Sequence, residues 1–267
     1  MIGFIGTGNM GSAMLGGIIK SGLYAPSQIM VSDASSEALN RTAAAHPGIV
    51  TTTENSEVVK QADILILAVK PHIYPIVLKE VGSLVPTETL VVTIAAGVTL
   101  DKMTELLSEK HKIVRTMPNT PALVGEGMTA LCPNGNITSE DLEIIKKIFS
   151  SFGKCEVLPE SQINGYTSLC GSSPAWVFMM IEALVDGAVL EGLPRAKAYT
   201  MAAQAVMGSA KMVLETGKHP AELKDMVCSP GGTTIEAVGE LESHGFRSSL
   251  IEAVRVCTNK ADFLAGE

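Results

Sequence analysis

The 267-residue sequence lacks the features that mark disulfide-rich, zinc-binding or nucleic-acid-binding proteins. Its five cysteines are odd in number, scattered, and free of any C-x-x-C pair, which argues against a disulfide framework and a zinc site. There is no long basic cluster, and the formal net charge of −8 disfavours nucleic acid or an anionic membrane as a partner. The five histidines are dispersed, and no obvious serine triad is present. Small molecules therefore remain the expected ligands, and the thiols are expected to be reduced.

Signals for export or membrane insertion are also missing. The first strand-like run begins at residue 2, which leaves no room for a secretory signal, so a cytoplasmic location is expected. The longest uncharged stretch, residues 163–181, is interrupted by Gly, Ser, Asn and Pro residues. We predict that it forms two helices and a turn and fails as a membrane span.

A glycine-rich turn follows the short apolar run at residues 2–5. It reads Gly6, Thr7, Gly8, Asn9, Met10 and Gly11, a G-x-G-x-x-G pattern, and an apolar helical stretch follows it. Such glycines allow a tight strand-to-helix turn, close approach of the backbone to a pyrophosphate, and close helix packing. The unpaired N–H groups and the dipole of the helix would then hold the phosphates. A dinucleotide site is predicted here, with an ordinary tight turn as the alternative.

Alternating apolar runs and helical patterns predict the fold of the first domain. The expected strands are 2–5, 28–32, 63–69 and 89–95, and the expected helices are 12–20, 35–45, 54–61, 74–85 and 100–110. This order is typical of a parallel sheet covered on both faces. Further apolar segments, at 112–116, 127–132 and 154–157, and a helix at 139–152 could extend the sheet at its far edge. The fold class is therefore α/β, with an N-terminal Rossmann-type, doubly wound, mostly parallel sheet over residues 1–160.

The remaining residues, 161–267, are predicted to form an all-helical C-terminal domain. Helical spacing occurs at 176–190, 195–215, 220–227, 233–243 and 246–265. Residues 195–215 are rich in Ala and Met with few charges, so this helix must be buried on most faces. Burial in a dimer and a central place in the core of its own chain are both consistent with the pattern.

An acidic residue lies at the end of the second predicted strand. Asp33 stands 22 residues (33 − 11) after Gly11, where a carboxylate would accept hydrogen bonds from an adenosine ribose. That placement favours NADH, whereas Ser32, Ser35 and Ser36 could hold the 2′-phosphate of NADPH. Asp33 and Ser35 also resemble an ordinary helix N-cap, and this alternative stays open.

Two more strand ends offer candidate ligand contacts, because open α/β sheets bind ligands at the carboxyl ends of their strands. The first carries Ala68, Val69, Lys70, Pro71 and His72, and the second carries the small residues Ala95, Ala96 and Gly97, which would suit a flat nicotinamide ring. A solvated lysine and simple strand-helix packing are the alternatives. The loop at 115–121, which has two prolines, is preformed and suits a ligand, although most such loops are connectors.

Two small, hydroxyl-bearing turns precede helices in the second half. One holds Ser172 and Ser173, and the other holds Gly232, Thr233 and Thr234. Backbone N–H groups at the start of the later helix would bind a carboxylate in the same way that they bind phosphate, through hydrogen bonds and the positive end of the helix dipole. The alternative is that Ser229 and Thr233 only cap a helix.

Several of these segments together resemble the Δ1-pyrroline-5-carboxylate reductase family. The resemblance is carried by 68–72, by Met-Pro-Asn-Thr-Pro at 117–121, and most specifically by 223–242, with Ser-Pro-Gly-Gly-x-Thr followed by Ile, Ala and Leu-Glu. It covers essentially the whole chain. Ser173 stands where the family more often has glycine, and Trp176 stands where it more often has tyrosine.

The resemblance implies reduction of 1-pyrroline-5-carboxylate to L-proline by hydride from NADPH or NADH to C5. It implies cofactor contacts from the glycine turn, from Ser32, Asp33 and Asn55, and from both strand ends. Thr234 becomes the hydrogen-bond partner or proton donor of the ring nitrogen. Gly232 and Thr233 would hold the carboxylate, with Ser172 and Ser173 opposite. A homodimer with interlocked helical domains, and a decamer of five dimers, are also implied.

A β-hydroxyacid or related imine dehydrogenase is the competing enzyme class. It would need an acid-base lysine on the helix after the Gly-Ser-Ser-Pro turn, and residues 176–190 contain none. A nucleotide-sensing or scaffold protein is the non-enzymatic alternative, and the Ser-Pro-Gly-Gly-Thr-Thr turn disfavours it.

Overall fold

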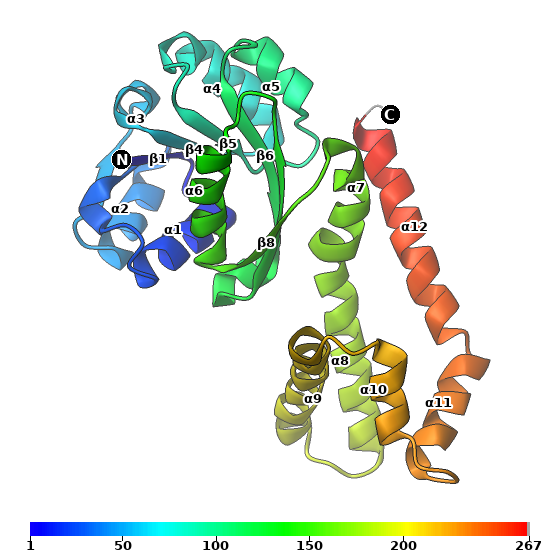
Figure 1. Ribbon diagram of the computed structural model, residues 1–267. Coiled ribbons are helices and arrows are strands. Elements are labelled where there is room, and N and C mark those ends of the chain that lie inside the picture. Colours follow the sequence, from blue (N-terminus) through cyan, green and yellow to red (C-terminus); the bar gives the residue numbers. More distant parts are fainter. Residues whose placement is uncertain (266–267) are drawn as a thin grey trace. The chain divides into compact units, whose positions relative to one another are not determined.

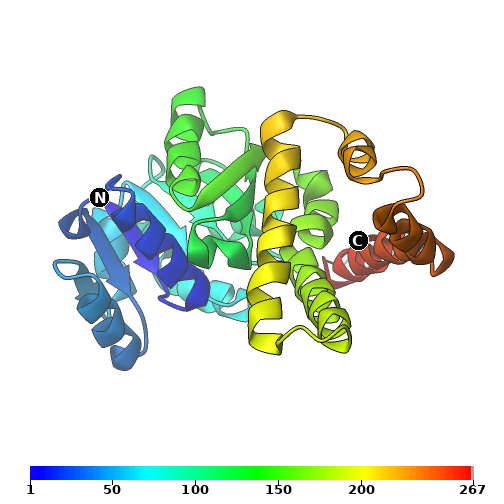
Figure 2. The ribbon, with the colours of Figure 1, turned by 90° about the horizontal axis from the view of Figure 1, so that it is seen from below.

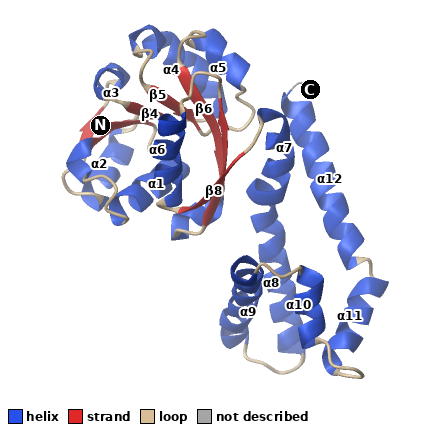
Figure 3. Ribbon diagram, in the orientation of Figure 1, coloured by secondary structure: helices blue, strands red, loops and turns tan. Residues whose placement is uncertain are grey.

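The computed structural model describes residues 1–265, which form two compact units. The sheet unit comprises Met1–Gly171 and the chain from Thr258 onward, and the helical unit comprises Ser172–Cys257. The first unit holds all the strands of the described chain, drawn red in Figure 3.

Eight strands form one sheet in the order β3-β2-β1-β4-β5-β6-β7-β8. All neighbours pair in parallel except β6 and β7, which are antiparallel. The chain reverses its direction of strand addition at β1, which pairs with β2 on one side and β4 on the other. The strands are β1 Ile2–Ile5, β2 Ile29–Ser32, β3 Val50–Thr52, β4 Ile64–Leu67, β5 Leu90–Thr93, β6 Lys112–Pro118, β7 Gly127–Pro133 and β8 Gly153–Val157.

Six helices cover the two faces of this sheet (Figure 1). One apolar cluster lies under α1, α2 and α6, and a second lies under α3, α4 and α5. Alternation along β1 explains both clusters, because Phe4 faces the first and Ile5 the second. The helices are α1 Asn9–Lys20, α2 Ser36–Ala45, α3 Asn55–Gln61, α4 Tyr74–Val81, α5 Leu100–Leu106 and α6 Ser139–Ser150.

The helical unit contains most of the C-terminal helices. These are α8 Ser173–Leu190, α9 Arg195–Thr216, α10 Pro220–Val227 and α11 Thr233–Ser243, followed by α12 Phe246–Ala265, whose last turns belong to the sheet unit. Helices α8 and α9 pack side by side (Figure 2). Ala198 is the only buried residue of α9, so α9 is not a core helix of the helical unit.

Three local predictions are wrong. The loop expected at residues 115–121 begins only after Pro118, because β6 runs to that residue and pairs there with β7. Strand β3 is not foreseen, because its three residues at the sheet edge, two exposed and one partly buried, show no apolar alternation. The expected turn within residues 163–181 is also absent: α7 (Ile163–Tyr166) continues through a π-helical segment, Thr167–Ser172, into α8. Pro174 sits in the first turn of α8, where its missing N–H costs little.

This continuous stretch, Glu160–Leu190, is by length and composition the one helical stretch in residues 1–265 that could cross a membrane. Large apolar side chains are exposed along it and along α9, α10 and α12, among them Phe178, Met179, Leu190, Met207, Leu214, Val227 and Ile251. A surface this apolar requires cover.

Candidate active site

The glycine turn after β1 is shaped by three glycines with different surroundings. Gly6 has a φ of +100°, and a Cβ there would lie 2.9 Å from the backbone of Ala68. A Cβ on Gly11 would lie 2.7 Å from the carbonyl oxygen of Gly6. A Cβ on Gly8 would meet no protein atom within 4 Å. Gly6 and Gly11 are therefore required by the fold, whereas Gly8 keeps open space beside the turn.

Gly8 is also the N-cap of α1, and it provides no side chain to cap the helix. The first-turn N–H groups of α1 and the positive end of its dipole are thus available to an anion. A cavity of about 730 Å³ opens here, at the carboxyl ends of β1, β2, β4 and β5. Its lining includes Gly6, Gly8, Asn9, Met10, Asp33, Asn55, Ala68, Val69, Lys70, Pro71 and Ala96, all predicted as cofactor contacts.

The other predicted cofactor residues do not line this cavity. Thr7 lies beside a smaller cavity of about 250 Å³ between α1 and α2. Ser32 is fully buried and donates a hydrogen bond to Asn55 Oδ1 at 2.8 Å. The remaining three, Gly11, Ala95 and Gly97, shape the turns beside the cavity.

Asp33 is held from two directions. Its Oδ2 accepts hydrogen bonds from the backbone N–H of Thr7 at 2.8 Å and the Thr7 hydroxyl at 2.9 Å, and its Oδ1 accepts one from the N–H of Ser35 at 2.9 Å. Partial burial by itself raises the pKa of Asp33, but these hydrogen bonds and the nearby Arg41 outweigh it and hold the pKa below its ordinary value. The helix cap is Ser35, whose hydroxyl accepts from Ala38 N–H.

Tyr74 braces two of the strand ends at the cavity, a role that the sequence does not reveal. Its buried hydroxyl donates to the carbonyl of Leu67 and accepts from the Thr93 hydroxyl at 2.9 Å and from Ile94 N–H at 3.3 Å. Burial raises the pKa of Tyr74 to about 12, so the phenol stays protonated. Tyr74 thus fixes β4 relative to β5, and with it the lining residues that follow each strand.

The prolyl loop after β6 has a structural role at Asn119. Its side chain donates to the carbonyl of Cys170 at 2.9 Å and accepts from Met128 N–H at 2.8 Å. The next residue, Thr120, lines the dinucleotide-type cavity. The loop therefore serves both as a joint within the sheet unit and as part of the cavity wall.

The turn before α11 lies in the helical unit. Gly231 has a φ of +66°, and Gly232 is the N-cap of α11 without a side-chain cap. Neither Ser229 nor Thr233 is that N-cap, since Thr233 is the first residue of the helix. Thr234 is the next residue of the same first turn. The 11-residue helix thus presents its first-turn N–H groups uncapped by a side chain, as an anion site requires.

The predicted serine pair lies at the start of α8. Ser172 occupies the N-cap position, and its hydroxyl oxygen accepts a hydrogen bond from the Cys257 thiol at 3.2 Å. Ser173 is the first residue of the helix and is half-buried.

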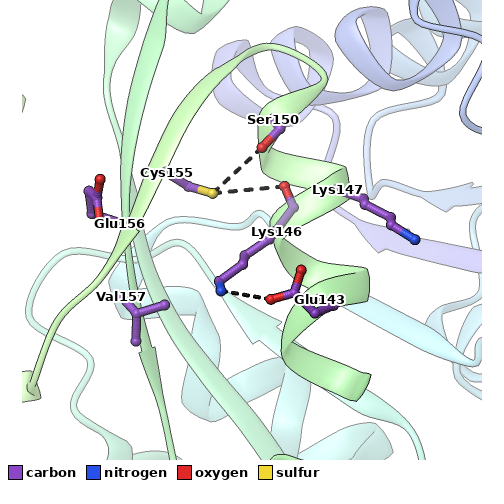
Figure 4. Close-up of a pocket in the computed structure, with 7 residues that line it drawn as sticks. All are labelled: Glu143, Lys146, Lys147, Ser150, Cys155, Glu156 and Val157. Carbon is purple, nitrogen blue, oxygen red and sulfur yellow. Dashed lines mark hydrogen bonds and ion pairs between the residues drawn. The ribbon is translucent and has the colours of Figure 1, made fainter. Parts of the chain in front are cut away.

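A further cavity of about 520 Å³ lies between α6 and β8. Figure 4 shows Lys146 turned toward Glu143, with 2.7 Å between Nζ and Oε1, and Cys155 turned toward Ser150. Burial raises the pKa of the Cys155 thiol, which disfavours a reactive thiolate. No group of His, Cys, Asp and Glu suited to a metal is present among the described residues.

Comparison with known proteins identifies the family to which this chain belongs. Residues 160–264 match a family model described as pyrroline-5-carboxylate reductase dimerisation, and residues 1–97 match one described as NADP oxidoreductase coenzyme F420-dependent. Pyrroline-5-carboxylate reductase from Escherichia coli (strain K12) is 54% identical over 99% of this chain and 98% of its own. The chain belongs to the pyrroline-5-carboxylate reductase family.

Other members support the assignment. The enzyme of that name from Methanosarcina acetivorans is 47% identical over 95% of this chain and 93% of its own. The structure of a pyrroline-5-carboxylate reductase from Coxiella burnetii superposes with a TM-score of 0.93 at 36% identity, covering 98% of this chain and 97% of that one. The Plasmodium falciparum pyrroline carboxylate reductase, solved with NADP bound, gives 0.87 at 31% identity over 99% and 97%.

The predicted family and fold class are confirmed. Within this reductase-family cavity, sequence reasoning missed several lining residues, namely Ile5, Ala34, Ile73, Val77, Ile94, Thr120 and Leu123. Thr120 had a signal, because it lies in the prolyl loop that suits a ligand. The apolar members had none, since their residue types are those of any core position.

Proposed function

We propose that this chain reduces 1-pyrroline-5-carboxylate to L-proline with NADPH or NADH, the last step of proline biosynthesis. The observation that carries the proposal is the end-to-end match at 54% identity, which spans both the glycine-turn cavity and the uncapped turn before α11. The activity is that of an NAD(P)H-dependent oxidoreductase acting on a C=N bond.

The sheet unit provides the cofactor site. The uncapped first turn of α1 would hold the pyrophosphate, and the space beside Gly8 admits the phosphates. Asn55 and Lys70 line the same cavity, and the backbone of Ala95–Gly97 turns beside it. These residues fit a nicotinamide dinucleotide, which when bound supplies the hydride.

The helical unit provides the substrate site. The N–H groups of Gly232 and Thr233 would bind the substrate carboxylate at the start of α11, and Ser172 and Ser173 would add polar contacts. The Gly232 N–H donates to the Ser229 carbonyl at 3.0 Å, so the carboxylate would have to take the place of that carbonyl. The imine gains a hydride at C5 and a proton at the ring nitrogen, so its C=N bond becomes a C–N single bond. Thr234 would donate a hydrogen bond or that proton to the nitrogen. Catalysis is then positioning together with electrostatics.

The proposed domain division assigns residues 1–160 to dinucleotide binding and 161–267 to dimerisation and substrate binding. Two copies would interlock through their helical domains, and five such dimers would form a decamer. The match of residues 160–264 to a dimerisation model and the exposed apolar side chains of α8 and α9 support this. Because a second copy would cover those side chains, the assembly needs no membrane. The net charge of −8 disfavours nucleic acid as a partner, and we place the protein in the cytoplasm.

Loss of reduced-nicotinamide absorbance with purified protein and pyrroline-5-carboxylate tests the activity. We expect Thr234→Ala to lower kcat by roughly ten- to ten-thousand-fold, with about a hundredfold or more if Thr234 transfers the proton and less if it only positions the substrate. Ser243→Ala removes an exposed hydroxyl at the other end of α11 and serves as the matched control. Near-wild-type turnover in Thr234→Ala would remove Thr234 from the mechanism. No turnover in wild-type protein that binds the cofactor would refute the substrate.

A further inference from the structure

Asp33 is fixed at the wall of the dinucleotide cavity. A carboxylate has about four acceptor positions. Thr7 occupies two of them and Ser35 one, at 2.8 to 2.9 Å, which joins the glycine turn to the start of α2. One acceptor position remains, on the oxygen bonded to Ser35. The carboxylate also stays charged at neutral pH, because these bonds lower its pKa.

Of the positive charges near Asp33, one is paired with another carboxylate and the other follows a different strand. Arg41 pairs with Glu37 one turn away on α2, with 2.7 Å between Nη1 and Oε1. Lys70 is the one cation in the described lining of the cavity. It follows β4, and β1 separates β4 from β2, so Lys70 begins two strand spacings, roughly 10 Å, from the Asp33 strand. The carboxylate of Asp33 therefore has no cation of its own at the end of β2, since Arg41, which acts on it from α2, is paired with Glu37.

We propose that Asp33 makes this reductase select NADH over NADPH, by accepting a hydrogen bond from the 2′-hydroxyl of the adenosine ribose and repelling a 2′-phosphate. The inference rests on the proposed function only in that the cavity holds a nicotinamide dinucleotide. It is not inherited from the comparisons, in which the matched family model is described as an NADP oxidoreductase and the Plasmodium structure holds NADP.

The test is direct binding of NADH and NADPH to the full-length protein, followed by nicotinamide fluorescence and by calorimetry. We expect wild type to bind NADH about tenfold or more tightly than NADPH, because one carboxylate beside the ribose repels the 2′-phosphate. Asp33→Ser removes the charge and should shift the affinity ratio toward NADPH by about the same factor. Asp33→Asn keeps the side-chain shape and should shift the ratio in the same direction even if Asp33→Ser loosens the turn.

Two controls separate electrostatics from packing. Raising the salt concentration should narrow the wild-type preference, because the repulsion is screened, and should leave the ratio of Asp33→Asn nearly unchanged. Arg41→Ala should leave the wild-type ratio within about twofold. A selective loss of NADPH affinity in Arg41→Ala would mean that Arg41 leaves Glu37 to bind the 2′-phosphate, and would overturn the inference.

The inference and the proposed function fail in different ways. Equal or tighter binding of NADPH by wild type, or an unchanged ratio in both Asp33 variants, overturns the role of Asp33 while leaving imine reduction intact. Preferential binding of NADH without any reduction of pyrroline-5-carboxylate supports the role of Asp33 and refutes the proposed substrate.

Discussion

Loss of the carboxylate of Glu160 should destabilise the sheet unit more than any other single ion-pair change. Arg115 Nη1 lies 2.6 Å from Glu160 Oε1, and the same oxygen accepts the N–H of Leu100 at 2.8 Å. The Arg115 side chain is 5% exposed, whereas that of Glu160 is 28% exposed. The carboxylate thus neutralises a buried guanidinium and ties the chain after β8 to the first turn of α5.

The loss of stability depends on which charge remains unpaired after the substitution. Removing one partner of a fully buried pair costs about 3–5 kcal/mol. Partial exposure of Glu160 screens the pair, so we place Glu160→Ala at about 2–3 kcal/mol. For a chain of this size that lowers Tm by roughly 4–12 °C. Arg115→Met leaves the half-exposed carboxylate free to be hydrated and should cost about half as much.

Urea unfolding and thermal melts at a fixed subunit concentration measure these differences, because oligomerisation makes stability depend on concentration. The double variant Arg115→Met/Glu160→Ala should be less destabilised than the sum of the single variants, since neither charge is then left unpaired. The reasoning is refuted if Glu160→Ala lies within about 0.5 kcal/mol of wild type. It is equally refuted if Arg115→Met proves the more damaging change.

Three further predictions concern the glycine turn, acid stability and the helical unit. Gly8→Ala should keep the wild-type Tm but weaken dinucleotide binding, measured by calorimetry. Gly11→Ala should lower Tm, because its Cβ would lie 2.7 Å from a carbonyl oxygen. Equal Tm values for the two variants would contradict this prediction. Folding lowers the pKa of Asp33 below its ordinary value of 3.8. The ionised carboxylate therefore contributes fully to the free energy of unfolding above pH 3.8, and this contribution is lost as the pH falls through the pKa of the folded state. Asp33→Asn should therefore flatten the acid limb of a stability-against-pH curve, and an unchanged limb would count against it. Phe178→Glu, on the exposed face of α8, should yield monomers by light scattering, unlike Glu182→Gln in the same helix; a dimer in both would exclude this face.

The sheet unit is predictable where the signal is local. The turn at residues 6–11 lies between a strand and a helix that its own neighbours specify, so motif and context agree. Strand β3 gives no such signal, because its three residues are held by pairing with β2 and not by an apolar face. The π-helical segment at Thr167–Ser172 was predicted as a turn because its glycine and serines break helices more often than they extend them.

Asp33 shows why the candidate site is only partly predictable. Its spacing from the glycine turn is consistent with either a ribose ligand or a cap residue, and the sequence does not distinguish the two. The structure gives the cap to Ser35 and binds Asp33 to Thr7, 26 residues earlier in the chain. Asn55 is set in the same way, by Ser32 Oγ at 2.8 Å and Glu80 Oε2 at 3.1 Å. Contacts between distant segments decide such positions, and residue spacing does not encode them.

In the helical unit, the residue pattern indicates that helix faces are buried but does not indicate what buries them. The apolar pattern of α9 indicates that most of its faces are buried. The same pattern results whether the core of its own chain or a second chain buries them. The helical unit buries only Ala198 of α9, so the cover has to come from outside that unit. In the proposed dimer that cover is a second copy, and a two-fold interface requires each residue to suit the symmetry-related surface as well as its own. Small and flexible side chains meet that demand best, which accounts for the Ala and Met content of α9 better than burial within one chain would.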